Sequence, residues 1–448
     1  MKVVINACAC CASFSMYNEP APLIPLYGVP LIQRTLQSAI EAQLNDFVIV
    51  TREEDVAVRQ FVDRFAKSQS ISITHVTSGQ KQNFETALLK EKVAINSGFL
   101  YLSCFFIIDP KMLEGFISKV EKKSGLYIST DENHIEKKLD LLEIVRFQAK
   151  DGKCIALERG LAEFDGFATG IYYIPKSFVE KLAKQKSPDI EKTLSSSVKT
   201  SLAYCVSQEH YFWSFVDSPD ALMRTEEEML ASLRKSPHEN LIKKWFFRPI
   251  SSCLSSVLAL SKISPECISV IGFIFALLAA LFLSQSNYLE IFVGACLALL
   301  SFTFHIASEE VSILRNQCQS FSKYFDHILC KYSELALLSA FVLGTVDLDS
   351  KNIILIGIFA LVGTMMFHFS ADRYLEDFQQ KHPLENDMLI DPDIRFAVII
   401  LGAVFSLPIL TLVIFAVLMN AIVIRRLYVW RKDSEKLMTD KNAALGDS

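Results

Sequence analysis

Residues 305–334, HIASEEVSILRNQCQSFSKYFDHILCKYSE, lie between two strongly apolar runs and decide the fold of the C-terminal half. Each run is near the roughly 20 residues that a helix needs to cross a bilayer. Ionisable side chains inside membrane helices are costly and usually functional, which singles out His305, Asp326 and His327. Because residues four apart share one helix face, the stretch predicts two helix ends that present polar groups to one site. All three side chains are near helix ends, so simple hydration is an alternative.

Composition divides the chain of 448 residues into unlike parts. It is 51% hydrophobic, but residues 1–240 have the pattern of a soluble domain and 241–435 that of a membrane bundle. Residues 436–448 are expected to form a disordered tail. The net charge of −5 gives no indication of nucleic-acid binding. Eleven scattered cysteines suit a reducing compartment better than a disulfide framework.

The soluble part alternates apolar strands with amphipathic helices. The predicted strands are Val3–Ala7, Phe47–Thr51, Ile71–Val76 and Phe99–Ile108, and the predicted helices are Val29–Leu44 and Glu53–Ala66. Strands that alternate with helices indicate a Rossmann-like α/β fold, with a parallel sheet covered on both faces. Such sheets bind ligands at the carboxyl ends of their strands.

The second half is expected to be an all-α domain of six transmembrane helices. The spans are placed at about 267–284, 288–306, 326–346, 352–371, 394–407 and 409–427. A basic and aromatic border, Lys243–Arg248, precedes them, and 249–262 is expected to lie in the interface as a helix. Most Lys and Arg near the spans fall on one side, which places both termini and the soluble domain in the cytoplasm. We therefore expect a multi-pass protein of the inner or cytoplasmic membrane.

The stretch 305–334 resembles the motif of the CDP-alcohol phosphatidyltransferases, D-x2-D-G-x2-A-R-x8-G-x3-D-x3-D. In that family the Asp residues hold two divalent metals on a pyrophosphate and supply a base for the acceptor hydroxyl. Aligned on Tyr324, Asp326, Tyr332 and Glu334, the third Asp position is Asp326, which is the residue expected to bind metal. The other positions differ: His305, Ser308 and Cys330 replace Asp, Glu309 and Ser322 replace Gly, Ser312 replaces Ala, and Ile313 replaces Arg.

The same resemblance implies substrate contacts by arginines. Arg315 fits the frame of the motif, and Arg373 and Arg395 match basic positions that the family could use for an acceptor phosphate. For Arg373 and Arg395, a plain interfacial anchor is the alternative. His305 could replace an Asp as a metal ligand, although imidazole suits magnesium poorly.

The N-terminal part resembles the sugar-phosphate nucleotidyltransferases. Residues 19–32, EPAPLIPLYGVPLI, are similar to P-K-P-L-L-P-V-x-G-x-P-L-I, with Ala21 in place of the phosphate-binding Lys. The family's phosphate loop, A-A-G-x-G-x-R, cradles phosphates with backbone amides. Here residues 8–13 read CACCAS, with neither Gly nor Arg.

The metal-binding positions of that family are altered as well. A strand-end Asp should fall near Cys104–Phe106, where no carboxylate is present. Ala168 replaces the second Asp of F-D-x-V-D-T-G-I-F, and Phe215 replaces one Asp of W-x-D-V-D-T-P-E-D-L, which leaves Asp217 as a candidate metal ligand. Arg159 keeps a positive charge where the family has a sugar-phosphate Lys. Asp217 could instead cap the next helix, and Arg159 could be an ordinary solvated side chain.

The two domains in this order resemble one family of fusions, the bifunctional inositol-1-phosphate cytidylyltransferases and di-myo-inositol-phosphate-phosphate synthases. The resemblance implies a nucleotidyltransferase-like domain, a phosphatidyltransferase-like membrane domain embedded in the lipid bilayer, and CTP or a CDP-alcohol as ligand. It also implies a homodimer, or a heterodimer with a paralogue. Both motif sets lose phosphate-binding and metal-binding groups, so a degenerate, catalytically impaired member is the favoured interpretation.

Two alternatives stay open. The chain could be an active phosphotransferase that uses Mg or Mn with rearranged ligands, drawn from Asp326, Glu309, Glu310 and Glu334. It could also be a structural subunit of an active paralogue.

Overall fold

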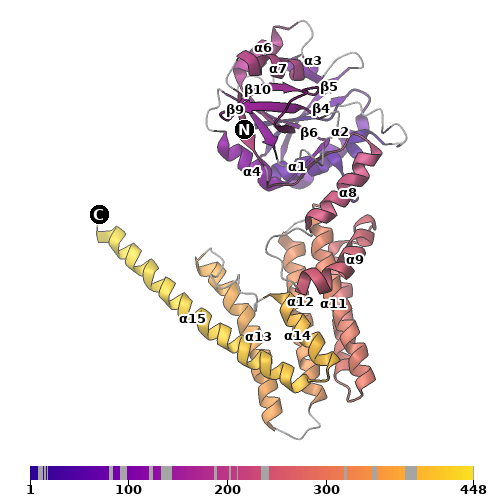
Figure 1. Ribbon diagram of the computed structural model, residues 1–448, viewed down its shortest axis with the longest axis vertical. Helices are drawn as coiled ribbons and strands as arrows, with labels where there is room; N and C mark the ends of the chain where they lie inside the picture. The colour runs from indigo at the N-terminus through magenta and orange to yellow at the C-terminus, as the bar shows by residue number, and fades with distance from the viewer. Residues whose placement is uncertain are drawn as a thin grey trace. The chain divides into compact units, whose positions relative to one another are not determined.

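The computed structural model describes residues 1–448 apart from 9–13, 15–16, 18, 80–83, 91–97, 121–124, 133–143, 186–188, 201–202, 209, 234–241, 317–319, 346–350, 379–390 and 447–448. The chain forms two compact units, Met1–Ser232 and Leu233–Ser448. The first unit is an α/β domain and the second is helical, as Figure 1 shows.

The N-terminal unit is built on a nine-stranded sheet with the order β5-β4-β1-β6-β11-β8-β12-β10-β9. The strands are β1 (Lys2–Asn6), β4 (Asp46–Arg52), β5 (Ser72–Ser78), β6 (Phe99–Ser103), β8 (Leu126–Asp131), β9 (Arg146–Lys150), β10 (Lys153–Glu158), β11 (Gly166–Ile174) and β12 (Ala203–Ser207). The four strands predicted from the sequence correspond to β1, β4, β5 and β6, which are parallel neighbours. Strand β11 runs antiparallel to β6 and β8, so the sheet is mixed, and the expectation of a wholly parallel sheet was wrong.

A short hairpin produces one of the antiparallel pairs of the sheet. Strands β9 and β10 are joined through Asp151 and Gly152, whose φ angles are 54° and 74°. Positive φ at both central residues is the type I′ geometry that matches the twist of a two-residue hairpin. The predicted strand Phe99–Ile108 is divided into β6 and β7 (Phe106–Ile108), and β7 pairs with β13 (Trp213–Phe215).

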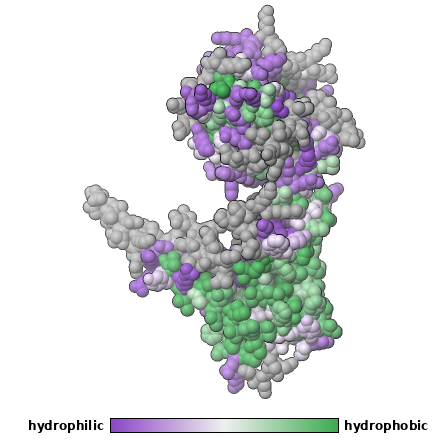
Figure 2. All heavy atoms as spheres, in the orientation of Figure 1, coloured by the Kyte–Doolittle hydropathy of each residue, from purple (hydrophilic) through white to green (hydrophobic). Residues whose placement is uncertain are grey.

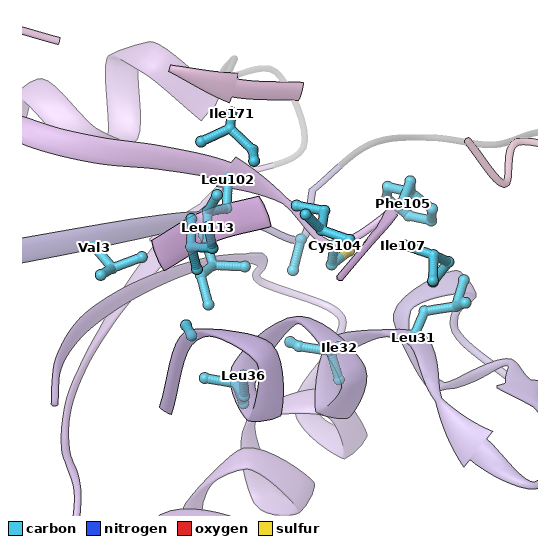
Figure 3. Close-up of a cluster of buried hydrophobic side chains, with 14 of the residues drawn as sticks. Val3, Leu31, Ile32, Leu36, Leu102, Cys104, Phe105, Ile107, Leu113 and Ile171 are labelled. Atoms are coloured by element: carbon cyan, nitrogen blue, oxygen red, sulfur yellow. The ribbon is translucent and has the colours of Figure 1, made fainter. Parts of the chain in front are cut away.

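Both faces of the sheet are covered, which explains the continuous apolar sequence of β1. Val3 and Ile5 belong to one buried cluster and Val4 to the other, because side chains alternate along a strand. Helix α1 (Leu31–Glu41) packs its apolar face on the first cluster, as Figure 3 shows. The other helices are α2 (Val56–Gln69), α3 (Phe84–Lys90), α4 (Pro110–Lys119), α6 (Lys176–Ala183), α7 (Ile190–Thr200) and α8 (Pro219–Leu233).

The C-terminal unit is a bundle of long apolar helices. They are α9 (Arg248–Leu260), α10 (Pro265–Leu283), α11 (Tyr288–Leu314), α12 (Ser320–Gly344), α13 (Lys351–Phe378), α14 (Pro392–Val404) and α15 (Pro408–Gly446). Among the described residues, five helices are long and apolar enough to cross a membrane: α10, α11, α12, α13 and α15. Figure 2 shows a broad hydrophobic surface over this unit, which is consistent with a membrane protein.

The sixth expected span, 394–407, corresponds to α14, which is shorter than the others. Its 13 residues extend over about 20 Å, whereas the hydrocarbon core of a bilayer is about 30 Å thick. Proline sets both limits, since Pro392 opens α14 and Pro408 opens the next helix.

The expectation of a disordered tail over 436–448 was wrong for most of that segment. Helix α15 continues to Gly446. The reason is visible in the sequence, since residues 435–438 are Glu, Lys, Leu and Met, all of which favour helix.

Candidate functional site

A cavity of about 570 Å³ lies in the helical unit, against the second half of α11 and the first turns of α12. Seven of the eight motif positions identified in the sequence line it: His305, Ser308, Glu309, Ser312, Ser322, Asp326 and Cys330. The spacing accounts for this, because residues at i, i+3, i+4 and i+7 share one face of a helix. The eighth position, Ile313, is 38% exposed and is not among the described residues that line the cavity.

Asp326 is held by hydrogen bonds from two other helices. Ser269 Oγ on α10 donates to Asp326 Oδ1 at 2.6 Å, and His305 Nδ1 on α11 lies 2.9 Å from the same oxygen. Ser308 Oγ lies 2.8 Å from Ser269 Oγ. Ser308 Oγ also donates to the backbone carbonyl of Pro265 at 2.8 Å. The two hydroxyl groups therefore lie between the Asp326 carboxylate and the start of α10.

His305 extends this network to α12. Its Nε2 atom lies 3.1 Å from Ser333 Oγ, which in turn donates to the carbonyl of Leu329 at 2.9 Å. The His305 residue is only 3% exposed. Both ring nitrogens are therefore engaged with protein groups, one with a carboxylate and one with a hydroxyl.

The motif positions next to Asp326 do not supply the carboxylates of a divalent-metal site. In the described part of the chain, no group of three or more His, Cys, Asp or Glu could hold a metal ion. Mg²⁺ and Mn²⁺ prefer several oxygen ligands, carboxylates above all. Here one oxygen of Asp326 accepts from two protein groups, and the neighbouring positions Ser308 and Cys330 supply no carboxylate.

Glu310, considered as an alternative metal ligand, is used elsewhere in the helical unit. Its carboxylate is buried and forms an ion pair with Arg248 at 2.5 Å. Ser251 and Ser255 donate further hydrogen bonds to it. Glu310 therefore ties α11 to α9, and it is not among the described residues that line the cavity.

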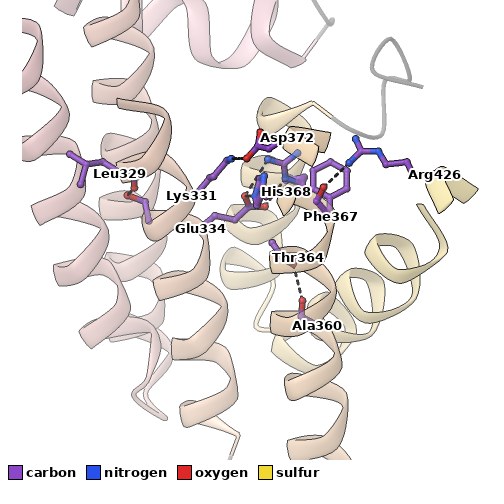
Figure 4. Close-up of polar contacts among 11 residues, drawn as sticks. Leu329, Lys331, Glu334, Ala360, Thr364, Phe367, His368, Asp372 and Arg426 are labelled. Carbon is purple, nitrogen blue, oxygen red and sulfur yellow. Dashed lines mark hydrogen bonds and ion pairs between the residues drawn. The ribbon is translucent and has the colours of Figure 1, made fainter. Parts of the chain in front are cut away.

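Glu334, the other alternative ligand, is 1% exposed and lies in a buried charge cluster. Arg395 binds it through two bonds, Nε to Oε1 at 2.6 Å and Nη2 to Oε2 at 3.2 Å. His368 Nε2 lies 3.1 Å from Oε2, and the Arg395 guanidinium stacks over Phe367 at 5.0 Å. Figure 4 shows Glu334 beside His368 and Phe367. Arg395, expected to bind substrate, thus faces a buried carboxylate that joins α12, α13 and α14.

The two other candidate arginines of this unit also contact protein groups. Arg315 is buried and donates to four backbone carbonyls, those of Leu258, Ala259, Ser261 and Ile263. These carbonyls belong to the last turn of α9 and the loop after it, where helix carbonyls lack internal partners. Arg373 is exposed on α13 and pairs with Glu376 at 2.9 Å.

In the N-terminal unit, aromatic rings from two segments where a metal carboxylate was expected are in contact. Phe106 and Phe215 are register partners in the β7–β13 pair, and their ring centroids lie 4.7 Å apart. Gly170, with φ of +81°, lies under Phe106, and an added Cβ would come within 2.5 Å of the ring. Trp213 lies 6.2 Å from Phe106, and its indole N–H donates to the buried Asp131 at 2.6 Å.

The segments expected to bind a nucleotide have no charged side chain at Cys8, Ala21 or Ala168, the positions that the structure describes. Cys8 is the described residue of the loop 8–13, and burial raises the pKa of its thiol to about 12. Residues 9–13 lie outside the described part. Ala21 opens the short 3-10 turn Ala21–Leu23, and Ala168 is buried in β11.

The two charged candidates of this unit are exposed or partly exposed. Asp217 directly precedes α8, where Ser218 Oγ, not Asp217, accepts the capping hydrogen bond from the Ala221 N–H at 3.2 Å. Arg159 forms an ion pair with Glu191 at 2.5 Å on the surface.

Several polar residues of the helical site were not predicted from the sequence as site residues. Lys243, Asp391 and Asp393 line the cavity, and Ser269 binds Asp326. Ser269 could have been found, since it is a polar side chain within an apolar helix. The pair Asp391 and Asp393 precedes or opens a helix, where acidic residues are common for local reasons.

Comparison with known proteins relates nearly the whole chain to one group. A protein of Aquifex aeolicus named "Bifunctional IPC transferase and DIPP synthase" is 23% identical over 421 residues, which cover 92% of this chain and 94% of the relative. A protein of the same name from Thermococcus kodakarensis is 23% identical over 364 residues, covering 80% and 79%. No family model matches the chain.

Two solved structures are similar to about half of the chain. The inositol-1-phosphate CTP transferase from T. maritima has 14% identity and a TM-score of 0.43, and the match covers 51% of this chain and 96% of that one. An apo UDP-glucose pyrophosphorylase has 14% identity and a TM-score of 0.44, with 52% and 98% covered.

Proposed function

Because the chain is a relative, over nearly its whole length, of the proteins named bifunctional IPC transferase and DIPP synthase, we propose that it is a membrane homologue without their metal-dependent chemistry. The observation that carries this proposal is the environment of Asp326. Its carboxylate accepts hydrogen bonds from Ser269 and His305 in the place where the resemblance implies a metal. The site then keeps its polar cavity and loses the means to activate a diphosphate.

The energetic argument concerns charge. Phosphoryl transfer depends on positioning and on neutralising the transferred group, and there is little covalent chemistry for the protein to perform. Loss of one stabilising donor typically slows such a reaction by about 10²–10³. At this site His305, Ser308 and Cys330 occupy three of the four Asp positions. The expected loss is correspondingly larger, because the metals themselves are not held.

The aromatic pair in the N-terminal unit supports the same proposal for the cytidylyl-transfer half. Phe106 and Phe215 are in tilted contact in a region where the resemblance implies carboxylates that bind a metal. Apolar rings favour contact with each other and offer no ligand to a hard cation.

Orientation and assembly form part of the proposal. The basic residues between spans, such as Arg315, Arg373 and Arg425, lie on one side of the expected topology, which supports a cytoplasmic N-terminal unit. A homodimer, or a heterodimer with an active paralogue, fits a chain that keeps the frame of a transferase. Co-purification with a motif-intact homologue tests the second form.

The deciding experiment measures thermal unfolding of the full chain in detergent. CTP and CDP-inositol are each added with and without Mg²⁺ or Mn²⁺, and a homologue whose sequence has all four Asp of the motif serves as the comparison. We expect a cooperative transition that shows no metal-dependent shift with either nucleotide. A metal-dependent shift, or turnover of CDP-inositol that is lost in Asp326→Ala with normal folding, would instead establish an active enzyme with rearranged ligands.

A further inference from the structure

Helix α9 has an amphipathic pattern that is the reverse of a helix on the surface of a soluble protein. A helix in water normally turns its polar and charged face outward. The polar side chains of α9 face inward, where the buried carboxylate of Glu310 on α11 binds three of them: Arg248, Ser251 and Ser255. Figure 1 shows α9 beside α11. The inner face of α9 is therefore the polar one.

The outer face of α9, together with the π-helical turn before it (Lys243–Phe247), is apolar. Five exposed positions recur at intervals of three and four residues, which puts them on one side of a helix. They form the outer stripe: Phe246, Ile250, Cys253, Val257 and Leu260. Val257 and Leu260 are 65% and 66% exposed. Contiguous exposed apolar surface of this kind marks a contact with another apolar medium.

The carboxyl end of α9 is tied to two helices that are long and apolar enough to cross a membrane, α10 and α11. Four residues, 261–264, separate Leu260 from the start of α10 at Pro265, a connection that spans at most about 18 Å. Arg315, at the end of α11, donates to the carbonyls of Leu258 and Ala259 in the last turn of α9. Helix α9 is thus held where both spans end, so lipid is the nearest apolar medium.

The border of the outer stripe is basic. Residues 242–263 contain four Lys or Arg and no Asp or Glu. Arg248 points inward to its ion pair, whereas Lys244 at one end and Lys262 at the other are exposed. Trp245, which is 76% exposed, lies beside Lys244. Tryptophan and lysine at the edge of an apolar surface suit a membrane interface, and clustered positive charge favours an anionic leaflet.

We propose that α9 and the turn before it form a lipid-binding surface for an anionic leaflet. The outer stripe enters the acyl boundary, and Lys244 and Lys262 contact lipid phosphates. A second copy of the chain fits this face less well. A two-fold contact pairs a patch with itself, and would bring two basic borders together. The surface does not depend on whether the cavity holds a metal.

The test places the full chain in nanodiscs and measures whether lipid touches Trp245. Lipids with brominated acyl chains quench tryptophan fluorescence on contact. The Trp245 signal is the difference between the parent and Trp245→Phe, because the chain also contains Trp213 and Trp430. We expect brominated lipid to quench most of that difference signal. Brominated phosphatidylglycerol should quench it at least about twofold more strongly than brominated phosphatidylcholine.

A pair of lysine variants tests the anionic preference. Lys244→Gln combined with Lys262→Gln should remove the difference between the two lipids and keep quenching by both. Lys67→Gln combined with Lys153→Gln makes the same change in charge at exposed positions of the N-terminal unit. This control should keep the preference of the parent.

A pair of apolar variants tests the outer stripe. Val257→Ser combined with Leu260→Ser should speed the reaction of Cys253 with a charged, membrane-impermeant maleimide by at least about threefold, because the stripe then holds lipid less well. Mass spectrometry of the peptide that contains Cys253 gives the rate. Val56→Ser, at an exposed apolar position of the N-terminal unit, should leave that rate unchanged.

Three results would overturn the inference. If brominated lipid does not quench the Trp245 signal, lipid does not reach this surface. If the two lipids quench equally, the anionic preference is wrong. If Cys253 reacts slowly while Trp245 is not quenched, a second copy covers the stripe. None of these results bears on a metal-dependent shift with CDP-inositol, so failure of this inference is distinct from failure of the proposed function.

Discussion

Phe106 and Phe215 face each other across the β7–β13 pair, with ring centroids 4.7 Å apart and planes inclined by 41°. They come from segments more than a hundred positions apart in the chain. Phe215 replaces an Asp of the nucleotidyltransferase motif, and Phe106 lies in the segment Cys104–Phe106 where the resemblance implies another. Offset aromatic contacts of this kind add about 0.5–1.5 kcal/mol beyond the burial of their surface. The two replacements are therefore energetically coupled.

Removing either ring should show this coupling. Phe106→Ala should lower the stability of the N-terminal unit by about 2–3 kcal/mol, because the ring also covers Gly170. The double variant with Phe215→Ala should be less destabilised than the sum of the single variants by about 0.5–1.5 kcal/mol. Denaturant unfolding of the four proteins measures the difference. Strict additivity would contradict the coupling, and the exposed change Val56→Ala should alter stability by less than about 0.5 kcal/mol.

The buried charge cluster of Glu334, Arg395 and His368 leads to a second prediction. Glu334→Gln leaves Arg395 buried without a full counter-charge, so the helical unit should lose about 3–5 kcal/mol. Adding Arg395→Met should recover part of this loss, because the pair is then removed together. Thermal unfolding in detergent gives the comparison. For the exposed pair of Arg373 and Glu376, Arg373→Met should change stability by less than about 1 kcal/mol.

Arg315 should prove to be a structural residue. A lysine lacks the planar fork that reaches four carbonyls, so Arg315→Lys should cost about 2 kcal/mol even though the charge is kept. Protease cleavage near the end of α9 should also become faster. Full stability together with weakened ligand binding would instead favour the substrate contact expected from the sequence. Arg373→Lys on the exposed face of α13 is the matched control.

Glu85 should give the N-terminal unit a measurable pH dependence. Burial raises the pKa of this carboxyl above 4.5, although its Oε1 atom accepts a hydrogen bond from the Ile190 N–H at 3.1 Å. The folded state then favours the protonated form, and the contribution of Glu85 to stability is present at low pH and lost as pH rises through the raised pKa. Compared with Glu85→Gln, the parent chain should gain stability as pH falls from 7 toward 4.5.

Thermal unfolding of both proteins across that pH range measures the gain. The exposed change Glu180→Gln should show no such trend relative to the parent. A difference in stability between the parent and Glu85→Gln that stays constant with pH would contradict a raised pKa of Glu85. So would a difference that grows at high pH in favour of the parent.

Local sequence patterns predicted the helices and strands better than they predicted which of these elements pair or pack together. The apolar face of α1 and the first parallel strands follow from periodicity and from continuous apolar runs. The antiparallel direction of β11 could not be predicted in this way, because strand direction depends on the length of the connections and on pairing between distant segments. Positions 305, 308, 309 and 312 share one helix face by their spacing, and they line one cavity.

What the sequence did not predict is how each of those side chains is satisfied. Asp326 finds its donors on α10 and α11, and Glu310 finds Arg248 from a helix more than fifty positions earlier. Such contacts depend on the packing of helices, which no local pattern contains. For the same reason Arg315 and Arg395 looked alike in the sequence and have unlike partners in the fold.

The short length of α14 has a consequence for the solvent around the cavity. In a bilayer, a helix of about 20 Å that begins at one surface stops about 10 Å short of the other. Helix α14 turns directly into the longer α15 at its carboxyl end, so the shortfall falls at Asp391 and Asp393. Carboxylates at that depth persist only beside protein or water. The polar mouth near these residues should therefore be an aqueous vestibule sunk into the lipid layer, and water-soluble labels should reach a depth at which lipid otherwise excludes them.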